Sequence, residues 1–232
     1  MRKYNHNTFK RRNPDEDANY LPLTIENIYE QEEKVQADPY YGKNGNGLLL
    51  RDLFSQKPNN YDYITVAHKI LLIDYTNSTR LKQRKAIVTI YDLARKIVTI
   101  QDLDYRIQQG DPSVVDEIAT ISSVNFFSFA SKFCFYHNKE KYSIFDGVVT
   151  ETIPQYLDVT QQYIKDCKNF VDNKSYKDFR DIIDKLIIAY DLGSVPNIRE
   201  KLDHFLWYAN KDRDKDNNKE ENSSDSSSGN ND

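Results

Sequence analysis

The sequence predicts an all-α protein: a single multi-helix globular domain with a polar N-terminal extension and a disordered acidic C-terminal tail. Through most of the middle of the chain, apolar residues recur every three or four positions, which is the spacing of an amphipathic helix. No stretch alternates apolar and polar residues between hairpin turns, as the strands of an antiparallel sheet do. From Lys211 onward apolar side chains are almost absent, so this part cannot offset the entropy of ordering it.

Composition narrows the class of protein further. The 232 residues suit one domain, and 17 tyrosines and 11 phenylalanines supply much of the apolar surface for a core. The formal net charge is −4, which argues against a protein that coats nucleic acid, although local basic clusters are present. The chain has neither an apolar run of about 18 residues nor a leader-like start. We therefore expect a cytoplasmic protein with no membrane contact.

The two cysteines, Cys134 and Cys167, both fall within apolar helical patterns. Neither belongs to a CxxC pair or to a Cys/His spacing typical of zinc sites. Buried free thiols in a reducing compartment are the expected state. No metal or other cofactor is expected.

Residues 1–58 are expected to form the N-terminal extension, ahead of a helical domain over residues 59–210 and the tail over residues 211–232. The extension opens with a basic arm that could lie along phosphates, composed of Arg2, Lys3, Lys10, Arg11 and Arg12. One short helix is expected from Thr24 to about Gln36, with the threonine as its N-cap. The DPYYGKNGNG stretch that follows Ala37 has three glycines and two asparagines, which indicates a loop.

The helical domain begins with an apolar pattern from Tyr61 to Tyr75. Its buried face is expected to hold Ile64, Ala67, His68, Leu71 and Tyr75, with His68 interpreted as a core histidine. The next stretch breaks the pattern and carries a basic cluster of Arg80, Lys82, Arg84 and Lys85. This basic cluster could contact nucleic-acid phosphates, although an ordinary solvated surface has the same composition.

Amphipathic helices are expected in succession after the basic cluster. Apolar residues at helical spacing occur over residues 87–98, 103–107, 114–119, 126–137, 146–156, 158–171, 175–190 and 196–209. Gly110 can take the left-handed conformation that ends a helix, and Asp111 can cap the helix that follows. Pro154 is expected to kink or split the helix that contains it.

The helix that precedes Asn138 is the richest in aromatic residues, and we expect it at the centre of the core. Ser128, Lys132 and Phe135 share one of its faces, which would place the stem of Lys132 against aromatic rings. A lysine that loses its proton there is a nucleophile able to form a Schiff base, whereas one that reaches solvent or pairs with an acid is structural. Asp146 can cap the next helix, or act as a base or stabilise a cation beside a cleft.

The stretch SFASKFCFYHNKEKYSIFDGVV, residues 128–149, resembles a motif in uncharacterised bacterial and mobile-element proteins. Those proteins are distantly similar to 8-oxoguanine DNA glycosylases of the helix-hairpin-helix superfamily. The stretches LLIDYTNSTRL, DLDYRIQQGDPSVVDEIA and LDHFLWYANK resemble the same group, so the similarity covers about residues 61–210. The resemblance implies a DNA-glycosylase-like scaffold, DNA as a partner, and excision of a base flipped out of the duplex into a pocket.

In these glycosylases a lysine follows a glycine-containing hairpin, and an aspartate further along the chain opens a helix. Lys132 and Asp146 match those two roles, so the resemblance implies a nucleophilic or orienting lysine and an aspartate that activates it or supports the sugar cation. Residues 119–131 depart from the pattern because they contain no glycine, and the two residues are only 14 positions apart. A scaffold of this kind can persist without the activity.

Three hypotheses for function remain open. The first is a nucleic-acid-related helical protein on a DNA-glycosylase-like scaffold, with or without catalysis. The second is a non-enzymatic interaction or regulatory protein of bacterial or mobile-element origin that contacts a protein partner through a helix face. The third is an enzyme for an unrelated substrate that uses Lys132, His137 and Asp146, and it has no metal, phosphate-loop or serine-triad motif to support it.

Overall fold

The structure is a computed structural model, and it describes residues 9–12, 20–77, 79, 81 and 89–208. Within these ranges the chain is helical, and its only β feature is an isolated antiparallel bridge between Arg11 and Leu157. The prediction of an all-α protein is therefore confirmed. No helix in the described ranges is both long enough and apolar enough to cross a membrane.

The described chain begins with two helices, α1 (Ile25–Ala37) and α2 (Asn46–Gln56), joined by a loop. The Oγ1 of Thr24 accepts a hydrogen bond from the backbone N of Asn27 at 3.2 Å, which confirms the predicted cap of α1. The sequence pattern predicts no helix where α2 lies. Both helices bury side chains in the core: Ile28, Val35, Leu50 and Phe54.

A first group of helices follows: α3 (Tyr63–Asn77), α4 (Ile90–Ile97), α5 (Leu103–Gln109), α6 (Ser113–Ala119) and α7 (Phe127–His137). The aromatic helix α7 contacts α2, α3, α5 and α6. Its buried side chains include Phe127, Phe129, Phe133 and Phe135. The predicted central position of this helix is therefore confirmed.

The second group comprises α8 (Gly147–Tyr156), α9 (Gln161–Asn169), a 3₁₀ turn (Val171–Asn173), α10 (Tyr176–Ala189) and a helix at residues 198–208. Part of the N-terminal arm lies along this group. The backbone N of Arg12 donates to the carbonyl of Tyr156 at 2.9 Å, and the guanidinium of Arg11 lies 4.2 Å from the ring centroid of Tyr190. These two arginines of the predicted basic arm thus contact the protein itself.

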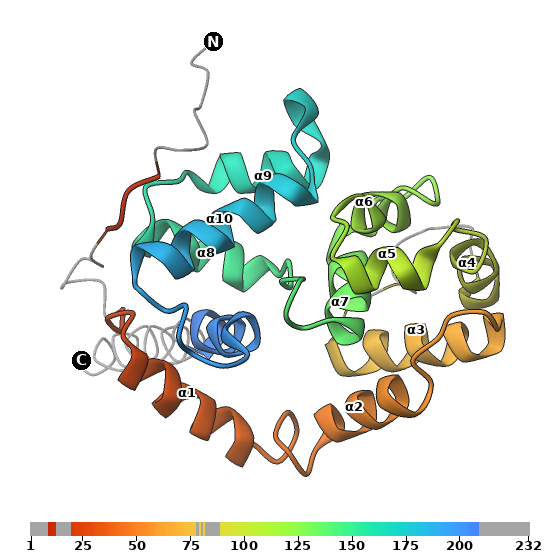
Figure 1. Cartoon of the computed structure of the whole chain (residues 1–232), viewed down its shortest axis with the longest axis horizontal. Helices are drawn as coiled ribbons and strands as arrows, with labels where there is room; N and C mark the ends of the chain where they lie inside the picture. Colours follow the sequence, from red (N-terminus) through yellow and green to blue (C-terminus); the bar gives the residue numbers. More distant parts are fainter. Residues whose placement is uncertain (1–8, 13–19, 78, 80, 82–88, 209–232) are drawn as a thin grey trace, which may run out of the picture.

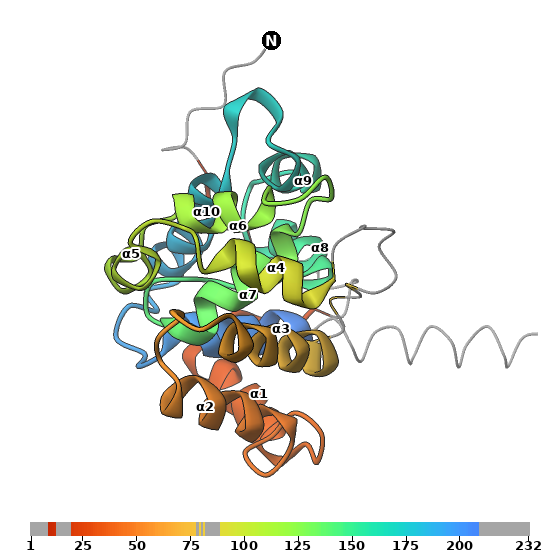
Figure 2. The same cartoon turned by 90° about the vertical axis from the view of Figure 1, so that its right-hand side faces the viewer.

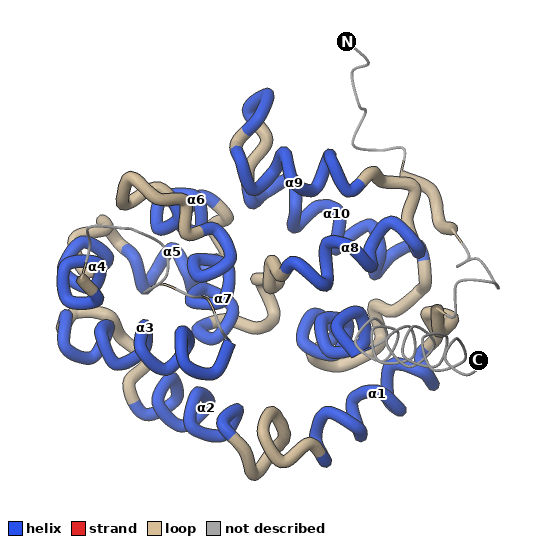
Figure 3. The backbone as a smooth tube through the Cα atoms, turned by 180° about the vertical axis from the view of Figure 1, so that it is seen from behind, coloured by secondary structure: helices blue, strands red, loops and turns tan. Residues whose placement is uncertain are grey.

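The two groups lie on opposite sides of the molecule, with α1 and α2 along one edge between them (Figure 1). In the view turned by 90°, α1 and α2 form a lower layer beneath α3 (Figure 2). The helix at residues 198–208, blue in Figure 1, lies between α1 and α8, and the view from behind shows the same arrangement (Figure 3). The chain crosses between the groups once after α7, and this crossing leads directly into α8.

The predicted helix ends are mostly observed. Gly110 ends α5 with a left-handed φ of 76°, and the Oδ1 of Asp111 accepts a hydrogen bond from the backbone N of Ser113 at 3.0 Å. Pro154 lies within α8, which continues to Tyr156 without the predicted split. The proline falls in the last turn of the helix, where little helix remains to be disrupted.

The predicted buried face of α3 is wrong except for Ala67, which is buried. Ile64, Leu71 and Tyr75 are 45%, 45% and 65% exposed, and His68 is also exposed, so it is not a core histidine. The core instead receives Val66, Ile70 and Ile73, together with the correctly predicted Ala67. Because α3 has apolar residues on both faces, helical spacing alone does not identify the buried one.

Several predicted features lie outside the described residues. They are the start of the basic arm, the basic cluster (Arg80, Lys82, Arg84 and Lys85) and the acidic tail over residues 211–232. Cys134 and Cys167 are described, and both are buried free thiols as predicted.

Candidate active site

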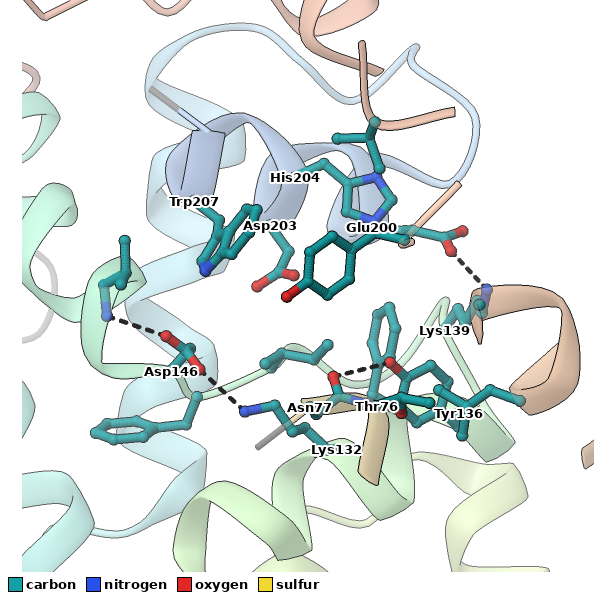
Figure 4. Close-up of a pocket in the computed structure, with 18 of the residues that line it drawn as sticks. Thr76, Asn77, Lys132, Tyr136, Lys139, Asp146, Glu200, Asp203, His204 and Trp207 are labelled. Atoms are coloured by element: carbon teal, nitrogen blue, oxygen red, sulfur yellow. Dashed lines mark hydrogen bonds and ion pairs between the residues drawn. The ribbon is translucent and has the colours of Figure 1, made fainter. Parts of the chain in front are cut away.

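A cavity of about 630 Å³ lies between the two groups of helices. Its walls come from α1, α2, α3, α7, the start of α8 and the helix at residues 198–208 (Figure 4). This volume is within the range typical of small-molecule and cofactor sites. The cavity therefore brings side chains from both ends of the sequence to one place.

Lys132, one of the two predicted catalytic residues, lies on the wall formed by α7. Its side chain is only 4% exposed, and its Nζ lies 3.0 Å from the Oδ2 of Asp146. The same Nζ donates to the Oγ of Ser128 at 3.1 Å, one helical turn earlier. The predicted shared face of Ser128 and Lys132 is thus observed, and the lysine is a buried, ion-paired group that faces a cavity.

Asp146, the other predicted catalytic residue, is the N-cap of α8. Its Oδ1 accepts a hydrogen bond from the backbone N of Val148 at 3.0 Å, which leaves Oδ2 for Lys132. The crossing segment before it is anchored because the backbone N of Phe145 donates to the Oγ of Ser131 at 3.0 Å. One carboxylate therefore begins a helix and pairs with the lysine, and its side chain remains 28% exposed.

Asp203 forms the opposite wall, and sequence reasoning missed it. It lies on the helix at residues 198–208 and faces Asp146 and Lys132 across the cavity (Figure 4). Its Oδ1 is buried and has no hydrogen-bond partner among the described residues. Burial, together with the negative charges of Asp146 and Glu200, raises the pKa of Asp203 to about 7, against the opposing charges of His204 and Lys132. The sequence offered one signal for Asp203: it lies directly beside the apolar residues Leu202, Phe205 and Leu206 of the last predicted helix.

Two contacts hold this wall in place. The Nδ1 of His204 lies 2.6 Å from the Oε2 of Glu32 on α1, and the Nζ of Lys139 lies 2.5 Å from the Oε1 of Glu200. Burial opposes a charge on His204, but its hydrogen bond and charge interaction with Glu32 raise its pKa above the ordinary value. The position of Asp203 is therefore fixed by neighbours on both sides of it.

The end of α3 supplies a polar edge to the cavity. The hydroxyl of Tyr136 donates to the Oδ1 of Asn77 at 3.1 Å, and the Nδ2 of Asn77 donates to the Oγ1 of Thr76 at 2.8 Å. All three residues line the cavity (Figure 4). The basic cluster begins with Arg80, three residues after Asn77, so the chain that leaves this edge leads into it.

The other predicted candidates do not join this site. His137 belongs to a separate buried cluster, where its Nε2 lies 3.4 Å from the Nζ of Lys69 and 3.2 Å from the Oδ1 of Asn60. The set of Lys132, His137 and Asp146 is therefore not assembled. Among the described residues, no three His, Cys, Asp or Glu side chains are grouped so that they could hold a metal ion.

The connection before α7 shows how the chain turns without a glycine. The backbone N of Phe126 donates to the carbonyl of Ala119 at 2.9 Å, which closes the loop between α6 and α7. Asn125 fastens this loop, because its Oδ1 accepts from the backbone N of Phe127 and its Nδ2 donates to the carbonyl of Lys168. Side-chain hydrogen bonds thus stabilise a helix–loop–helix unit directly ahead of Lys132.

Comparison with known proteins places the chain in a family. The family model HI_0787_N, described as an N-terminal domain, matches residues 25–141, which is half of the chain. The chain belongs to this family. The matched region contains α1 to α7 and Lys132 but ends before Asp146 and Asp203.

A curated relative from Haemophilus influenzae, an uncharacterized protein, is 29% identical over 130 residues. The aligned region covers 54% of this chain and 59% of the relative, so the chain spans about three fifths of the length of the relative it matches. No solved structure matches the chain.

Proposed function

We propose that the protein is a base-excision DNA glycosylase in which Lys132 is the nucleophile and Asp146 is its proton acceptor. The observation that carries this proposal is the 3.0 Å contact between their side chains on the wall of a cavity of about 630 Å³. The resemblance of residues 128–149 to the glycosylase motif supports the same two roles.

The chemistry follows from the contact. A lysine amine is a nucleophile only after it has lost a proton, and the Oδ2 of Asp146 lies at hydrogen-bond distance to receive it. The amine can then attack C1′ of a deoxyribose. The hydrogen bond from Val148 keeps the carboxylate oriented throughout.

The cavity suits a base that has been flipped out of a duplex. Enzymes of this kind bind the flipped base between aromatic or apolar side chains and read its edge with hydrogen bonds. Trp207, Phe145 and Tyr136 line the cavity and supply such surfaces, and Asn77 and Thr76 supply polar groups.

Contact with DNA requires positively charged side chains that can bind phosphates. The basic cluster of Arg80, Lys82, Arg84 and Lys85 follows the polar edge at Asn77 within a few residues. We assign the phosphate contacts to this cluster. Binding of DNA should then weaken steeply as salt rises, because each neutralised phosphate releases counterions.

Borohydride trapping tests the proposal directly. A duplex that carries a single abasic site is incubated with the protein and sodium borohydride, which reduces a Schiff base to a stable covalent bond. We expect a protein–DNA adduct that migrates more slowly on a denaturing gel. Absence of the adduct at low salt, where binding is strongest, would contradict the proposal.

A protein partner is the second candidate function, and the exposed face of α3 favours it. Ile64, Leu71 and Tyr75 form an apolar stripe on that face, and Tyr63 and Tyr91 lie beside it with their ring centroids 6.3 Å apart. A helix with such a stripe can pack into a groove on another protein. This role would be supported if a stoichiometric protein partner co-purifies with wild type but not with Leu71→Asp. Borohydride trapping by Leu71→Asp should stay at the wild-type level.

A further inference from the structure

We propose that Asp203 is the acid that protonates the departing base, which would make it a third catalytic residue of this site. This inference rests on the proposed function. It adds a group that lies outside residues 128–149, the stretch that implies the roles of Lys132 and Asp146, and outside the family match, which ends at residue 141.

The reaction needs a second proton-transfer group. When the N-glycosidic bond breaks, its electron pair leaves with the base, and an unprotonated base is a poor leaving group. Asp146 has just received a proton from Lys132 and lies on the same side of the sugar as that nucleophile. In a displacement at C1′ the base leaves on the side opposite the attacking amine, so the acid must stand across the cavity from Lys132.

Asp203 occupies that place. It projects from the helix at residues 198–208 into the cavity, on the wall that faces Lys132 and Asp146 (Figure 4). Its Oδ1 is buried without a hydrogen-bond partner among the residues that the structure describes. A buried polar atom without a partner carries a free-energy cost that a bound ligand can relieve. A proton shared between Asp203 and a nitrogen or oxygen of the base would satisfy it.

The surroundings favour the protonated form of Asp203. Burial is the largest cause of its raised pKa, and the carboxylates of Asp146 on α8 and Glu200 on its own helix add to it. His204 on its own helix and Lys132 on α7 act in the opposite direction. Each of these cations is itself engaged by another carboxylate, His204 by Glu32 of α1 and Lys132 by Asp146, and Lys139 of the chain after α7 likewise pairs with Glu200.

The cavity thus holds two carboxyl groups in different states. Asp146 is a paired carboxylate, and Asp203 has a pKa of about 7, so a large fraction of it carries a proton near neutral pH. An ion-paired carboxylate beside the lysine and a buried carboxyl group that favours its proton are the arrangement expected of a base and an acid in one site.

The first step balances with these groups alone. The Lys132 proton passes to Asp146, and the amine lone pair forms the bond to C1′. The N-glycosidic bond breaks, its electron pair goes to the base, and the Asp203 proton goes to the same base, which departs neutral. The new sugar-bound nitrogen carries a positive charge, and after this step it releases one proton to water while the Asp203 carboxylate takes one proton from water.

Two DNA substrates separate base departure from the chemistry of the lysine. One is a panel of duplexes that each carry one modified base, including 8-oxoguanine, from which the best substrate is used to measure base release. The other is a duplex with an abasic site, where no base has to leave. We compare wild type with Asp203→Asn, which keeps the size of the side chain but has no acid proton, and with Asp203→Glu, which restores it.

We expect Asp203→Asn to slow base release by at least about tenfold while borohydride trapping on abasic DNA stays at the wild-type level. Wild-type base release should fall as the pH rises above about 7, this alkaline limb should vanish in Asp203→Asn, and Asp203→Glu should recover part of the rate.

Base release by Asp203→Asn at the wild-type rate would overturn the role of Asp203 and leave the proposed function intact. Loss of trapping on abasic DNA in Asp203→Asn would show a structural role instead, and would also overturn the inference. Wild-type protein that neither releases any base of the panel nor traps abasic DNA would overturn the proposed function and this inference with it.

Discussion

Two buried lysines, Lys132 and Lys69, differ in what surrounds them, and the difference separates a candidate site from a structural cluster. Both lysines are buried, Lys69 on α3 and Lys132 on α7. The Nζ of Lys69 donates to the carbonyl of Asn59 at 3.1 Å and to the Oδ1 of Asn60 at 2.9 Å. The carboxylate whose charge acts on Lys69, that of Asp104, accepts hydrogen bonds from Asn60.

Lys132 has the two features that Lys69 lacks. It contacts a carboxylate directly, and it lines a cavity large enough for a substrate. Lys69 is surrounded by protein groups, with its Nζ 5.1 Å from the ring centroid of Phe54, and burial lowers its pKa to about 8 although the charge of Asp104 acts in the other direction. Burial alone therefore does not make a reactive lysine, because a nucleophile also needs a proton acceptor and access to substrate.

The largest expected effect is that of Lys132→Met. Removal of the proposed nucleophile should reduce borohydride trapping on abasic DNA by more than about a thousandfold. The matched control is Lys174→Met, which removes another largely buried, ion-paired lysine, 3.6 Å from Asp166 and outside the cavity. Lys174→Met should trap at the wild-type level. Equal trapping by Lys132→Met and Lys174→Met would show that Lys132 is no more reactive than a structural lysine.

Asp146→Asn should have the next largest effect. Loss of the proton acceptor should slow trapping by about 10²–10⁴-fold, the usual contribution of a general base. Asparagine is as good an N-cap as aspartate, so α8 should still begin at this residue. Loss of the ion pair leaves the buried charge of Lys132 without a counter-ion and should lower the melting temperature, so trapping is measured well below it. Wild-type trapping rates in Asp146→Asn would show that the carboxylate only caps the helix.

Lys69→Met tests the structural side of the comparison through its pH dependence. The pKa of Lys69 is lowered in the folded protein to about 8, so the unfolded chain holds more protons between this value and the ordinary lysine pKa. Wild-type stability relative to Lys69→Met should therefore rise with pH, by about 1–2 kcal/mol between about pH 7 and about pH 9.5. Denaturant unfolding at the two pH values measures this, and a difference that falls with pH would contradict it.

The smallest expected effect is that of Lys69→Met on the chemistry. The substitution leaves the carbonyl of Asn59 and the Oδ1 of Asn60 without their buried donor, which should cost about 1–3 kcal/mol of stability. Trapping on abasic DNA, measured well below the melting temperature, should remain at the wild-type level. A loss of trapping with the fold intact would place Lys69 in the reaction and break the comparison.

Local features of the fold were predictable because they depend on neighbouring residues. Thr24 and Asp146 cap their helices as predicted, since a capping side chain needs only an amide two or three positions away. The central position of α7 was also predictable, because a helix with so many aromatic residues must be buried on most sides. The convergence of Lys132 and Asp146 followed from a resemblance rather than from spacing.

Other features depend on contacts that are distant in sequence. The buried face of α3 could not be chosen, because both faces are apolar and the decision is made by the helices that pack on it. Asp203 could not be assigned to the site from its own segment, because Lys132 and Asp146 lie far from it in the sequence. Only the folded chain places all three residues on the wall of one cavity. The ion pair of Glu32 with His204, which fixes that wall, joins the two ends of the chain.

The central claim is that Lys132 itself bonds to the sugar, and peptide mapping tests it most directly. The borohydride-reduced adduct of wild-type protein with abasic DNA is digested with a protease and a nuclease, and the modified lysine is located by mass spectrometry. We predict that the sugar remnant lies on Lys132. A remnant on another lysine or on the N-terminal amine, with Lys132 unmodified, would contradict the account.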